Sequence, residues 1–328
     1  MTSEDTEIRA RPATGTPTSV GLRAASGERR RRGGGGAPGL AGGLLRTARP
    51  RQWIKNLLVF AAPGAAGALT DGEVMVRAVA AFAVFCVAAS GTYFLNDALD
   101  VEADRLHPTK QRRPIASGVV PTGPAKAIGV VLLLASVGCA LALGGWPLAL
   151  IIGIYVALQP LYSLWLKNLA VIDLAAVASG FVLRAIAGGV AVNLPISQWF
   201  LIVASFGSLF MVAGKRHAEH LDLGDDGGHH RSTLGDYSSS FLHYVQAVSS
   251  AVAIAAYCLW AFEKADVAMA PLWFQLSIIP LVLAVLRYAL LLDGGRGGAP
   301  EEIVLGDRSL QVLGLVWMAT FAIGVHVR

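Results

Sequence analysis

The sequence predicts an all-α polytopic membrane protein with nine transmembrane helices. Of its 328 residues, 54% are hydrophobic and only 15% are charged. Apolar stretches recur along nearly the whole chain, and each is long enough for the roughly 20 residues that cross a hydrocarbon core of ~30 Å. The stretches do not alternate with a period of two. They must therefore be helices, because lipid offers no partner to the backbone groups of an open strand.

A tail of residues 1–45 precedes the predicted membrane domain of residues 46–328. The tail is rich in Gly, Pro, Thr and Arg, and we predict that it is disordered and either attracts anionic lipid or stays solvated. It is not a secretory signal, because no apolar stretch follows its arginines closely. The predicted transmembrane segments are Trp53–Leu69, Met75–Leu95, Lys126–Leu143, Leu148–Leu166, Val171–Val192, Gln198–Gly214, His243–Phe262, Leu272–Leu292 and Leu310–Val325.

The three cysteines and the net charge exclude some classes of function. Cys86, Cys139 and Cys258 lie far apart inside apolar segments, without Cys-x-x-Cys spacing, so we predict that they are small buried hydrophobic residues. The net charge of +5 is distributed over the loops of a membrane protein. We therefore expect lipid headgroups and phosphorylated substrates as partners, and no nucleic acid.

Basic residues gather in the loops on one side of the predicted membrane. The positive-inside rule then places the amino terminus in the cytoplasm and, after nine spans, the carboxyl terminus outside. Three polar connections fall on the cytoplasmic side: Asn96–Ala125, Lys167–Ala170 and Lys215–Leu242. We expect the chemistry to face the cytoplasm.

An acidic run follows the second predicted segment. Asn96, Asp100 and Asp104 are spaced i, i+4 and i+8, so on one helix they share a face and can direct oxygens at a single Mg²⁺ ion. The basic residues Lys110, Arg112 and Arg113 follow and can bind phosphate. A metal beside a basic stretch suits a diphosphate leaving group. The alternative is a solvated helix end with charge pairs.

Several polar residues lie at or inside the apolar segments. Lys55 is either a substrate ligand or a lysine that extends to the interface beside Trp53. Arg184 is near the middle of its segment, where we expect an anionic partner. Asp173 caps its helix, pairs with Lys167 or takes part in catalysis.

The Lys215–Leu242 loop contains a second polar cluster. Its histidines have neither His-Glu-x-x-His nor finger spacing, which disfavours a zinc site. Lys215, Arg216 and Arg231 are more typical of an anion-binding set, with ordinary positive-inside charge as the alternative.

The acidic run resembles the first aspartate-rich motif of the UbiA superfamily of intramembrane prenyltransferases, and the resemblance covers most of residues 49–328. The resemblance implies a UbiA-type helical bundle. Four further runs are similar to the decaprenyl-phosphate phosphoribosyltransferase branch of that superfamily: Arg49–Asn56, Asp104–Lys110, Arg113–Gly118 and Lys215–Arg216.

The chain departs from ordinary members of the superfamily at the position of their second aspartate-rich motif, which reads Lys215-Arg216-His217-Ala218-Glu219. Basic residues in place of the second acidic motif would suit a site that binds a lipid monophosphate as acceptor and a soluble sugar diphosphate as donor. The resemblance thus implies phosphoribosyl diphosphate as donor and a polyprenyl phosphate, decaprenyl phosphate, as acceptor. It also implies a multi-pass protein of the plasma membrane that makes a cell-wall arabinan precursor, and it leaves a homo-oligomer open.

The resemblance also implies the site residues. We expect Asp97, Asp100 and Asp104 to be catalytic, and Asn96 and Asp100 to hold Mg²⁺. The expected substrate-binding residues are Lys55, Tyr93, Lys110 and Arg113 for the donor, Lys167, Arg184, Lys215 and Arg216 for the lipid phosphate, and Tyr162.

Two alternatives stay open at this point. The first is transfer of a prenyl group from a prenyl diphosphate to an aromatic or glycerol-phosphate acceptor, which the missing second aspartate-rich motif disfavours. The second is a lipid-linked transporter. The one-sided polar clusters and the lack of a convincing internal repeat favour an enzyme instead.

Overall fold

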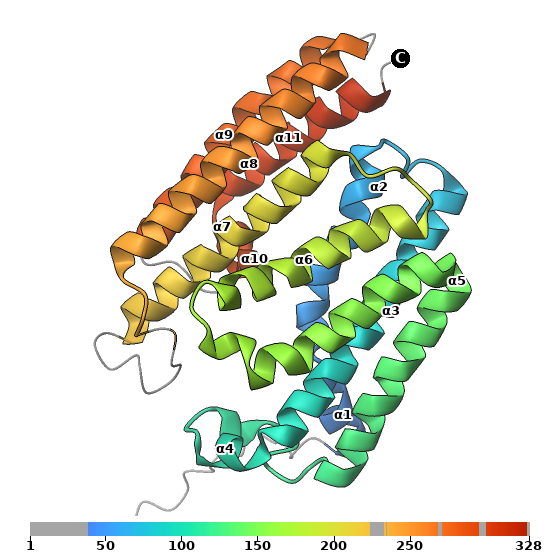
Figure 1. Ribbon diagram of the computed structural model, residues 1–328, viewed down its shortest axis with the longest axis vertical. Helices are drawn as coiled ribbons and strands as arrows, with labels where there is room; N and C mark the ends of the chain where they lie inside the picture. Colours follow the sequence, from blue (N-terminus) through green and yellow to red (C-terminus); the bar gives the residue numbers. More distant parts are fainter. Residues whose placement is uncertain (1–38, 224–232, 234, 268–270, 295–299, 327–328) are drawn as a thin grey trace, which may run out of the picture. The chain divides into compact units, whose positions relative to one another are not determined.

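The computed structural model describes residues 39–223, 233, 235–267, 271–294 and 300–326, and within these ranges every regular element is a helix (Figure 1). The all-α fold class is therefore confirmed. The elements, with 3₁₀ helices labelled η, are α1 Leu40–Ala48, η1 Pro50–Phe60, α2 Ala61–Ala65, α3 Gly72–Leu99, α4 Val101–Leu106, η2 Lys110–Arg112, α5 Thr122–Leu164, η3 Leu166–Asn168, α6 Ile172–Ala191, α7 Gln198–Leu223, α8 Ser239–Val267, α9 Pro271–Asp293, α10 Pro300–Gly306 and α11 Arg308–His326.

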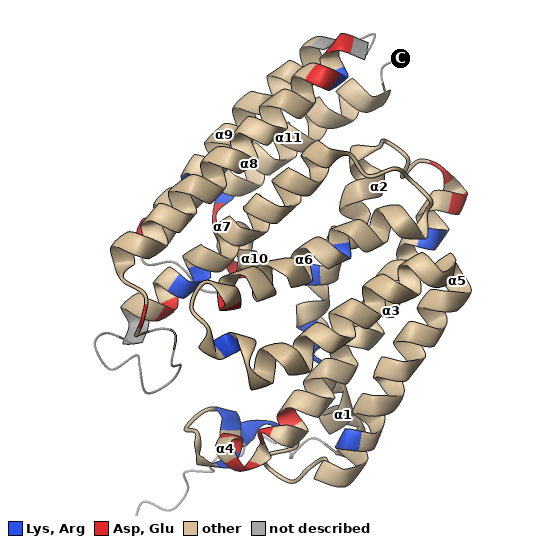
Figure 2. Cartoon of the chain, viewed as in Figure 1, with Lys and Arg blue, Asp and Glu red and all other residues tan. Residues whose placement is uncertain are grey.

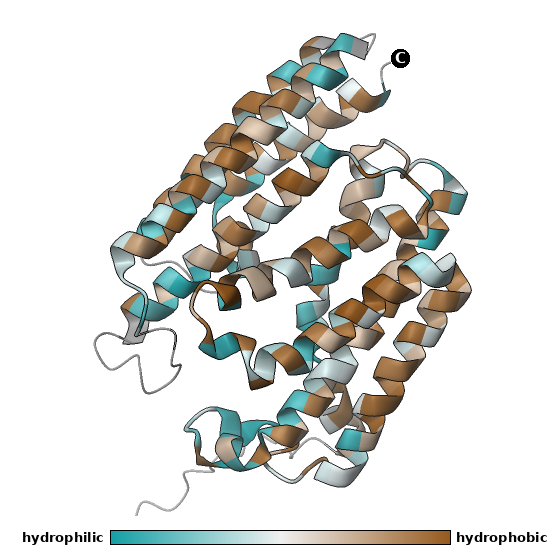
Figure 3. Ribbon diagram, viewed as in Figure 1, coloured by the Kyte–Doolittle hydropathy of each residue, from teal (hydrophilic) through white to brown (hydrophobic). Residues whose placement is uncertain are grey.

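Seven helices in the described part of the chain are long and apolar enough to cross a membrane: α3, α5, α6, α7, α8, α9 and α11. Hydrophobic residues cover most of their length in Figure 3. The chain is an integral membrane protein. The predicted count of nine is not reproduced as nine long helices, and the difference arises in α5 and in the segment before α3.

Helix α5 combines two of the predicted segments. Its 43 residues would span ~65 Å as a straight helix, about twice the thickness of a hydrocarbon core. The backbone leaves helical geometry at Gly144 and Gly145, and Gly145 has φ 64° and ψ −160°. Figure 1 shows two arms that meet at a sharp bend. The bend falls between the predicted segments Lys126–Leu143 and Leu148–Leu166.

The first predicted segment, Trp53–Leu69, is not one long α-helix. It consists of the 3₁₀ helix η1 and the short helix α2. Its backbone packs closely on α6, because a Cβ atom added to Gly188 would lie 1.8 Å from the carbonyl oxygen of Val59. A glycine at this crossing lets two backbones approach, as small residues do between membrane helices. The contact places Lys55 and Asn56 beside α6.

Two smaller predictions also differ from the structure. Residues 40–45, assigned to the disordered tail, belong to α1, while residues 1–38 lie outside the described residues. Of the three cysteines, only Cys86 is buried; Cys258 is half-buried and Cys139 is exposed on α5. An exposed thiol on an apolar span lies where lipid, rather than protein, surrounds it.

The core that supports the site lies between η1, α3, α5 and α6. Phe85, Leu148, Ile152 and Tyr155 are its large members. Alanines from three of these helices fill the remaining space. Small side chains allow the close van der Waals packing that stabilises helix pairs in lipid.

Charged residues gather at the end of the bundle that holds α4, the turn after α5 and the end of α7 (Figure 2). These are the three polar connections that the sequence assigns to one side.

Candidate functional site

A polar cavity of about 160 Å³ lies between η1, α3, α5 and α6. It unites five residues predicted to bind substrate or metal: Lys55, Tyr93, Asn96, Tyr162 and Arg184. The four elements supply one or two of these residues each, so the site forms only when the bundle packs.

Arg184 is a buried cation in the wall of this cavity, with 8% of its surface exposed. Its Nε donates to Asn56 Oδ1 at 2.7 Å, and its two Nη atoms donate to Gly180 O at 2.6 Å and Tyr155 Oη at 2.9 Å. The guanidinium also lies 4.8 Å from the centre of the Tyr155 ring. These partners are neutral, and no carboxylate in the described part of the chain pairs with Arg184. The expected anionic partner is absent from the protein there, so an anionic ligand would complete the site.

The acidic run does not continue one straight helix. Helix α3 ends at Leu99, and Asp100 occupies the junction to α4 with φ −89° and ψ 9°. Asp104 is 3% exposed, and its carboxylate accepts from Arg113 Nη1 at 2.7 Å. Backbone bonds from Asp100 N to Asn96 O and from Asp104 N to Asp100 O keep the three residues at successive turns, but Asp104 is paired with an arginine.

Asp97 is held by two arginines. Its Oδ1 accepts from Arg49 at 2.6 Å and from Arg113 at 3.0 Å. Arg113 thus bridges Asp97 and Asp104, and Arg49 also lies 4.7 Å from the centre of the Tyr93 ring. The sequence assigned no role to Arg49. Its membership in the basic run before Trp53 is the only signal, since no helical spacing relates residues 49 and 97.

Asn96 and Asp100 fit a magnesium site in which oxygens of the substrate supply further ligands. In the described residues, no three His, Cys, Asp or Glu side chains come close enough to hold a metal ion. Asn96 lines the polar cavity, and Asp100 lies one turn beyond it, exposed and without a side-chain cap bond to α4. Mg²⁺ is usually held by one or two carboxylates with water and substrate phosphates. Asn96 and Asp100 match that pattern.

Arg216 is engaged in a buried network behind the cavity. Its side chain is 4% exposed and donates to Asp173 Oδ2 at 3.0 Å, Glu219 Oε2 at 2.6 Å and Tyr162 Oη at 3.0 Å. Asp173 neither caps α6 nor pairs with Lys167, as two of the predictions had it. It pairs with Arg216 instead, and Tyr237 donates to its other oxygen. Tyr162 connects this network to the cavity.

Other predicted residues lie outside the polar cavity. Lys110 is exposed on η2, Lys167 is half-buried on η3, and Lys215 is exposed with its Nζ 3.7 Å from Glu219. His217 packs against His243. His229, His230 and Arg231 lie outside the described residues.

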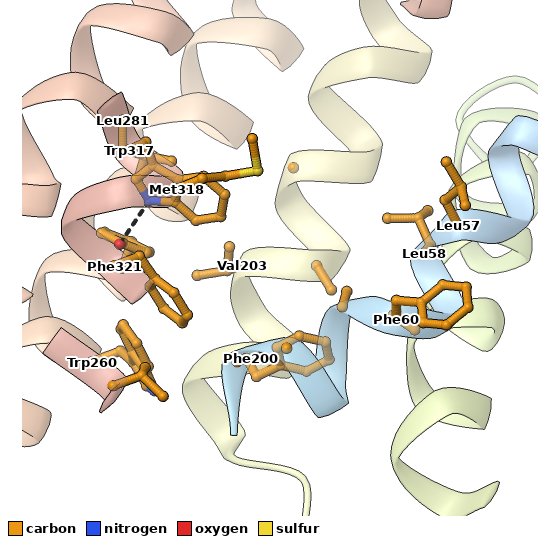
Figure 4. A pocket seen from close by; sticks show the side chains of 18 of the residues that line it. Leu57, Leu58, Phe60, Phe200, Val203, Trp260, Leu281, Trp317, Met318 and Phe321 are labelled. Atoms are coloured by element: carbon orange, nitrogen blue, oxygen red, sulfur yellow. Dashed lines mark hydrogen bonds between the residues drawn. The ribbon is translucent and has the colours of Figure 1, made fainter. Parts of the chain in front are cut away.

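A second, apolar cavity of about 680 Å³ lies beside the polar one. Figure 4 shows side chains of η1, α7, α8, α9 and α11 around it, among them Phe60, Val203, Trp260 and Phe321. Phe181 of α6 lines both cavities. A polar head site and an apolar space thus share one wall.

The chain matches the model of the UbiA prenyltransferase family over residues 57–304. It belongs to this family. The resemblance predicted from the acidic run is thereby confirmed. A UbiA homologue from Archaeoglobus fulgidus, whose structure holds DMAPP and Mg²⁺, superposes with a TM-score of 0.64 at 16% identity, covering 87% of this chain and 99% of that one. At this identity the likeness concerns the fold.

Two curated relatives of this UbiA chain are much closer in sequence. The decaprenyl-phosphate phosphoribosyltransferase of Corynebacterium glutamicum is 47% identical over 292 residues, which cover 88% of each chain. The enzyme of the same description from Mycolicibacterium smegmatis is 47% identical over 302 residues, covering 88% of this chain and 93% of the relative. Both agree with the branch of the family that the sequence resembles.

Proposed function

We propose that this UbiA-family enzyme transfers a 5-phosphoribosyl group from phosphoribosyl diphosphate to decaprenyl phosphate, releasing diphosphate, for the synthesis of a cell-wall arabinan precursor. The observation that carries the proposal is Arg184, a buried cation with neutral partners, in a polar cavity that shares Phe181 with an apolar cavity. Such a pair of cavities suits a phosphate with a hydrocarbon chain. The 47% identity to curated enzymes of this activity supports the same conclusion.

The reaction replaces one bond at C1 of the ribose. The bond to the diphosphate oxygen breaks, C1 gains oxocarbenium character, and an oxygen of the lipid phosphate forms the new bond. Lys55 and Tyr93 bind the departing diphosphate. Asn96 and Asp100 would hold Mg²⁺, which supplies Lewis-acid neutralisation of the diphosphate charge when bound.

The lipid phosphate is already anionic at neutral pH and needs no strong base. Arg184 holds it against C1 of the ribose, so positioning supplies much of the rate. The polyprenyl chain extends past Phe181 into the apolar cavity. We place the polar cavity toward the cytoplasm at the plasma membrane, because basic residues gather at the neighbouring end of the bundle.

Prenyl transfer from a prenyl diphosphate is less well supported. The position of the second aspartate-rich motif offers Lys215 and Arg216, and its one carboxylate, Glu219, already accepts from Arg216. A second metal-binding pair of carboxylates is therefore missing from that position.

The proposal is tested by transfer of radiolabel from phosphoribosyl diphosphate to decaprenyl phosphate by the purified full chain in detergent. The reaction is run with Mg²⁺ or with excess chelator, and Asp100→Ala is compared with Glu102→Ala, an exposed acid nearby that pairs with Arg105. We expect labelled lipid that requires the metal and Asp100 but not Glu102. Prenyl transfer from a prenyl diphosphate, without phosphoribosyl transfer, would overturn the proposal.

A further inference from the structure

The turn of residues 165–171 joins α5 and α6, the two helices that provide most of the residues lining the polar cavity. The end of α5 contributes Gln159 and Tyr162, and the first turns of α6 contribute Ala176 and Gly180. Short-range backbone bonds run through the turn, such as those from Asn168 N to Trp165 O and from Leu169 N to Leu166 O. The turn therefore connects two walls of the cavity.

Val171, the last residue of this turn, has a strained backbone. Its φ is 67° and its ψ is −43°, a conformation that β-branched residues rarely adopt. Strain of this kind persists only where the surrounding structure holds it. Here the Val171 N–H donates to the hydroxyl of Tyr237 at 2.6 Å.

Tyr237 is itself fixed from several sides. The residue is 3% exposed, its ring stacks on Phe241, and its hydroxyl donates to Asp173. Burial and the bond to Asp173 raise the pKa of Tyr237, so the hydroxyl keeps its proton near neutral pH. A neighbour in the same segment, Thr233, donates to the carbonyl oxygen of Lys167 at 3.2 Å. Thr233 and Tyr237 thus bind the turn at two places, Lys167 and Val171.

A series of hydrogen bonds connects the Tyr237 hydroxyl to the polar cavity. Tyr237 and Arg216 share Asp173, and Arg216 donates to Tyr162 Oη. Arginine only donates hydrogen bonds, so the Tyr162 oxygen must accept and its proton is left for another acceptor. No acceptor in the described part of the chain takes that proton, and Tyr162 lines the polar cavity. A phosphoryl oxygen of a substrate would take it.

We propose that Tyr237 is a positioning residue for the phosphoryl-binding site, because its hydroxyl holds the Val171 turn and the Asp173–Arg216 pair that orients Tyr162. The inference rests on the proposed function and deepens it. It also makes Arg216 a positioning residue that acts through Tyr162. Both the donor diphosphate and the lipid phosphate have phosphoryl oxygens that would accept the hydrogen bond from Tyr162.

The test compares Tyr237→Phe with Tyr244→Phe, a matched change at an exposed tyrosine on the next helix. Initial rates of the full chain in detergent are measured against phosphoribosyl diphosphate and, separately, against decaprenyl phosphate. We expect the KM for at least one substrate to rise about tenfold in Tyr237→Phe, the effect of one weakened hydrogen bond to a charged group. We expect no such rise in Tyr244→Phe.

The KM does not depend on the amount of folded enzyme, whereas the apparent kcat does. A Tyr237→Phe variant with a lowered apparent kcat but both KM values within twofold of wild type would show a purely structural role and overturn the inference. A rise confined to the donor or to the lipid supports it and identifies which phosphoryl group Tyr162 binds. A wild-type chain that transfers no phosphoribosyl group overturns the proposed function instead.

Discussion

The contacts at position 184 require an arginine rather than any other cationic side chain. Its three donor atoms reach Asn56, Gly180 and Tyr155 at once, which a single lysine nitrogen at the end of a flexible stem cannot reproduce. Lysine at this position would keep the charge but lose the geometry that presents it to the cavity.

We therefore expect Arg184→Lys to lower transfer to decaprenyl phosphate by about 10- to 100-fold, because bonds to a charged group are lost and the remaining charge is misplaced. The measurement is kcat/KM for the lipid. Arg77→Lys, at an ion pair with Glu73 remote from the cavity, is the control and should act like wild type. Equal kcat/KM for Arg184→Lys and wild type would contradict the role of the guanidinium geometry.

Asp97 and Asp100 are three residues apart and differ in their surroundings. The Asp97 side chain is 3% exposed and contacts two arginines, whereas Asp100 is exposed. We expect Asp97→Asn to lower the free energy of unfolding by about 2 kcal/mol, less than for a fully buried pair because Arg49 and Arg113 are partly exposed. Asp100→Asn should raise the Mg²⁺ concentration needed for half-maximal transfer and leave the melting temperature unchanged.

Thermal melting and Mg²⁺ titration of the two variants separate these roles. A large loss of stability in Asp100→Asn, or none in Asp97→Asn, would reverse the assignment.

At the scale of residues, the sequence predicts which polar side chains meet in one cavity better than it predicts their partners. Lys55, Tyr93, Asn96, Tyr162 and Arg184 are all in the predicted set and share one cavity. The pairs Arg49–Asp97 and Asp173–Arg216 are more than 40 residues apart in the chain. They depend on how one helix rotates against another, which the composition of a single segment does not encode.

At the scale of elements, hydropathy locates the apolar segments but not their backbone geometry. It predicts both arms of α5 and the boundary between them, where the structure places the bend at Gly144 and Gly145. It cannot distinguish the 3₁₀ backbone of η1 from an α-helix, because apolar length is the same signal for both.

Gly145 has a backbone conformation at φ 64° and ψ −160° that is essentially restricted to glycine. We expect Gly145→Ala to destabilise the protein by about 1–3 kcal/mol by straining the bend. Gly138→Ala is the matched control within the same helix, since an added Cβ there meets nothing within 4 Å and should change stability by less than about 1 kcal/mol. Thermal unfolding in detergent measures both, and equal melting temperatures would contradict the strain.

At the scale of the whole molecule, the apolar cavity joins segments from both ends of the chain. Its walls include Leu57 near the amino end and Phe321 near the carboxyl end. The sequence predicts the helices that form these walls, but it could not locate the groove for a lipid chain. Apolar residues that face a cavity and apolar residues that face lipid have the same composition.

Gly207 lines the apolar cavity on α7, and an added Cβ there meets nothing within 4 Å. We expect Gly207→Leu to occupy part of the cavity and raise the KM for decaprenyl phosphate about tenfold, with a smaller effect on a short-chain prenyl phosphate. Gly314→Leu, on α11 and away from both cavities, is the control. If both lipids were affected equally, the polyprenyl chain would not occupy this cavity.

The shared position of Phe181 has a consequence for inhibitor design. A small molecule with a phosphate mimic at one end and a compact branched hydrocarbon at the other would engage Arg184 and the apolar cavity together, with its linker against the Phe181 ring. It would compete with the lipid and leave the affinity for the soluble sugar unchanged. A substitution of Phe181 by a larger or smaller side chain would weaken binding of the natural lipid as well as of the inhibitor. Resistance mutations at Phe181 would therefore also impair the enzyme.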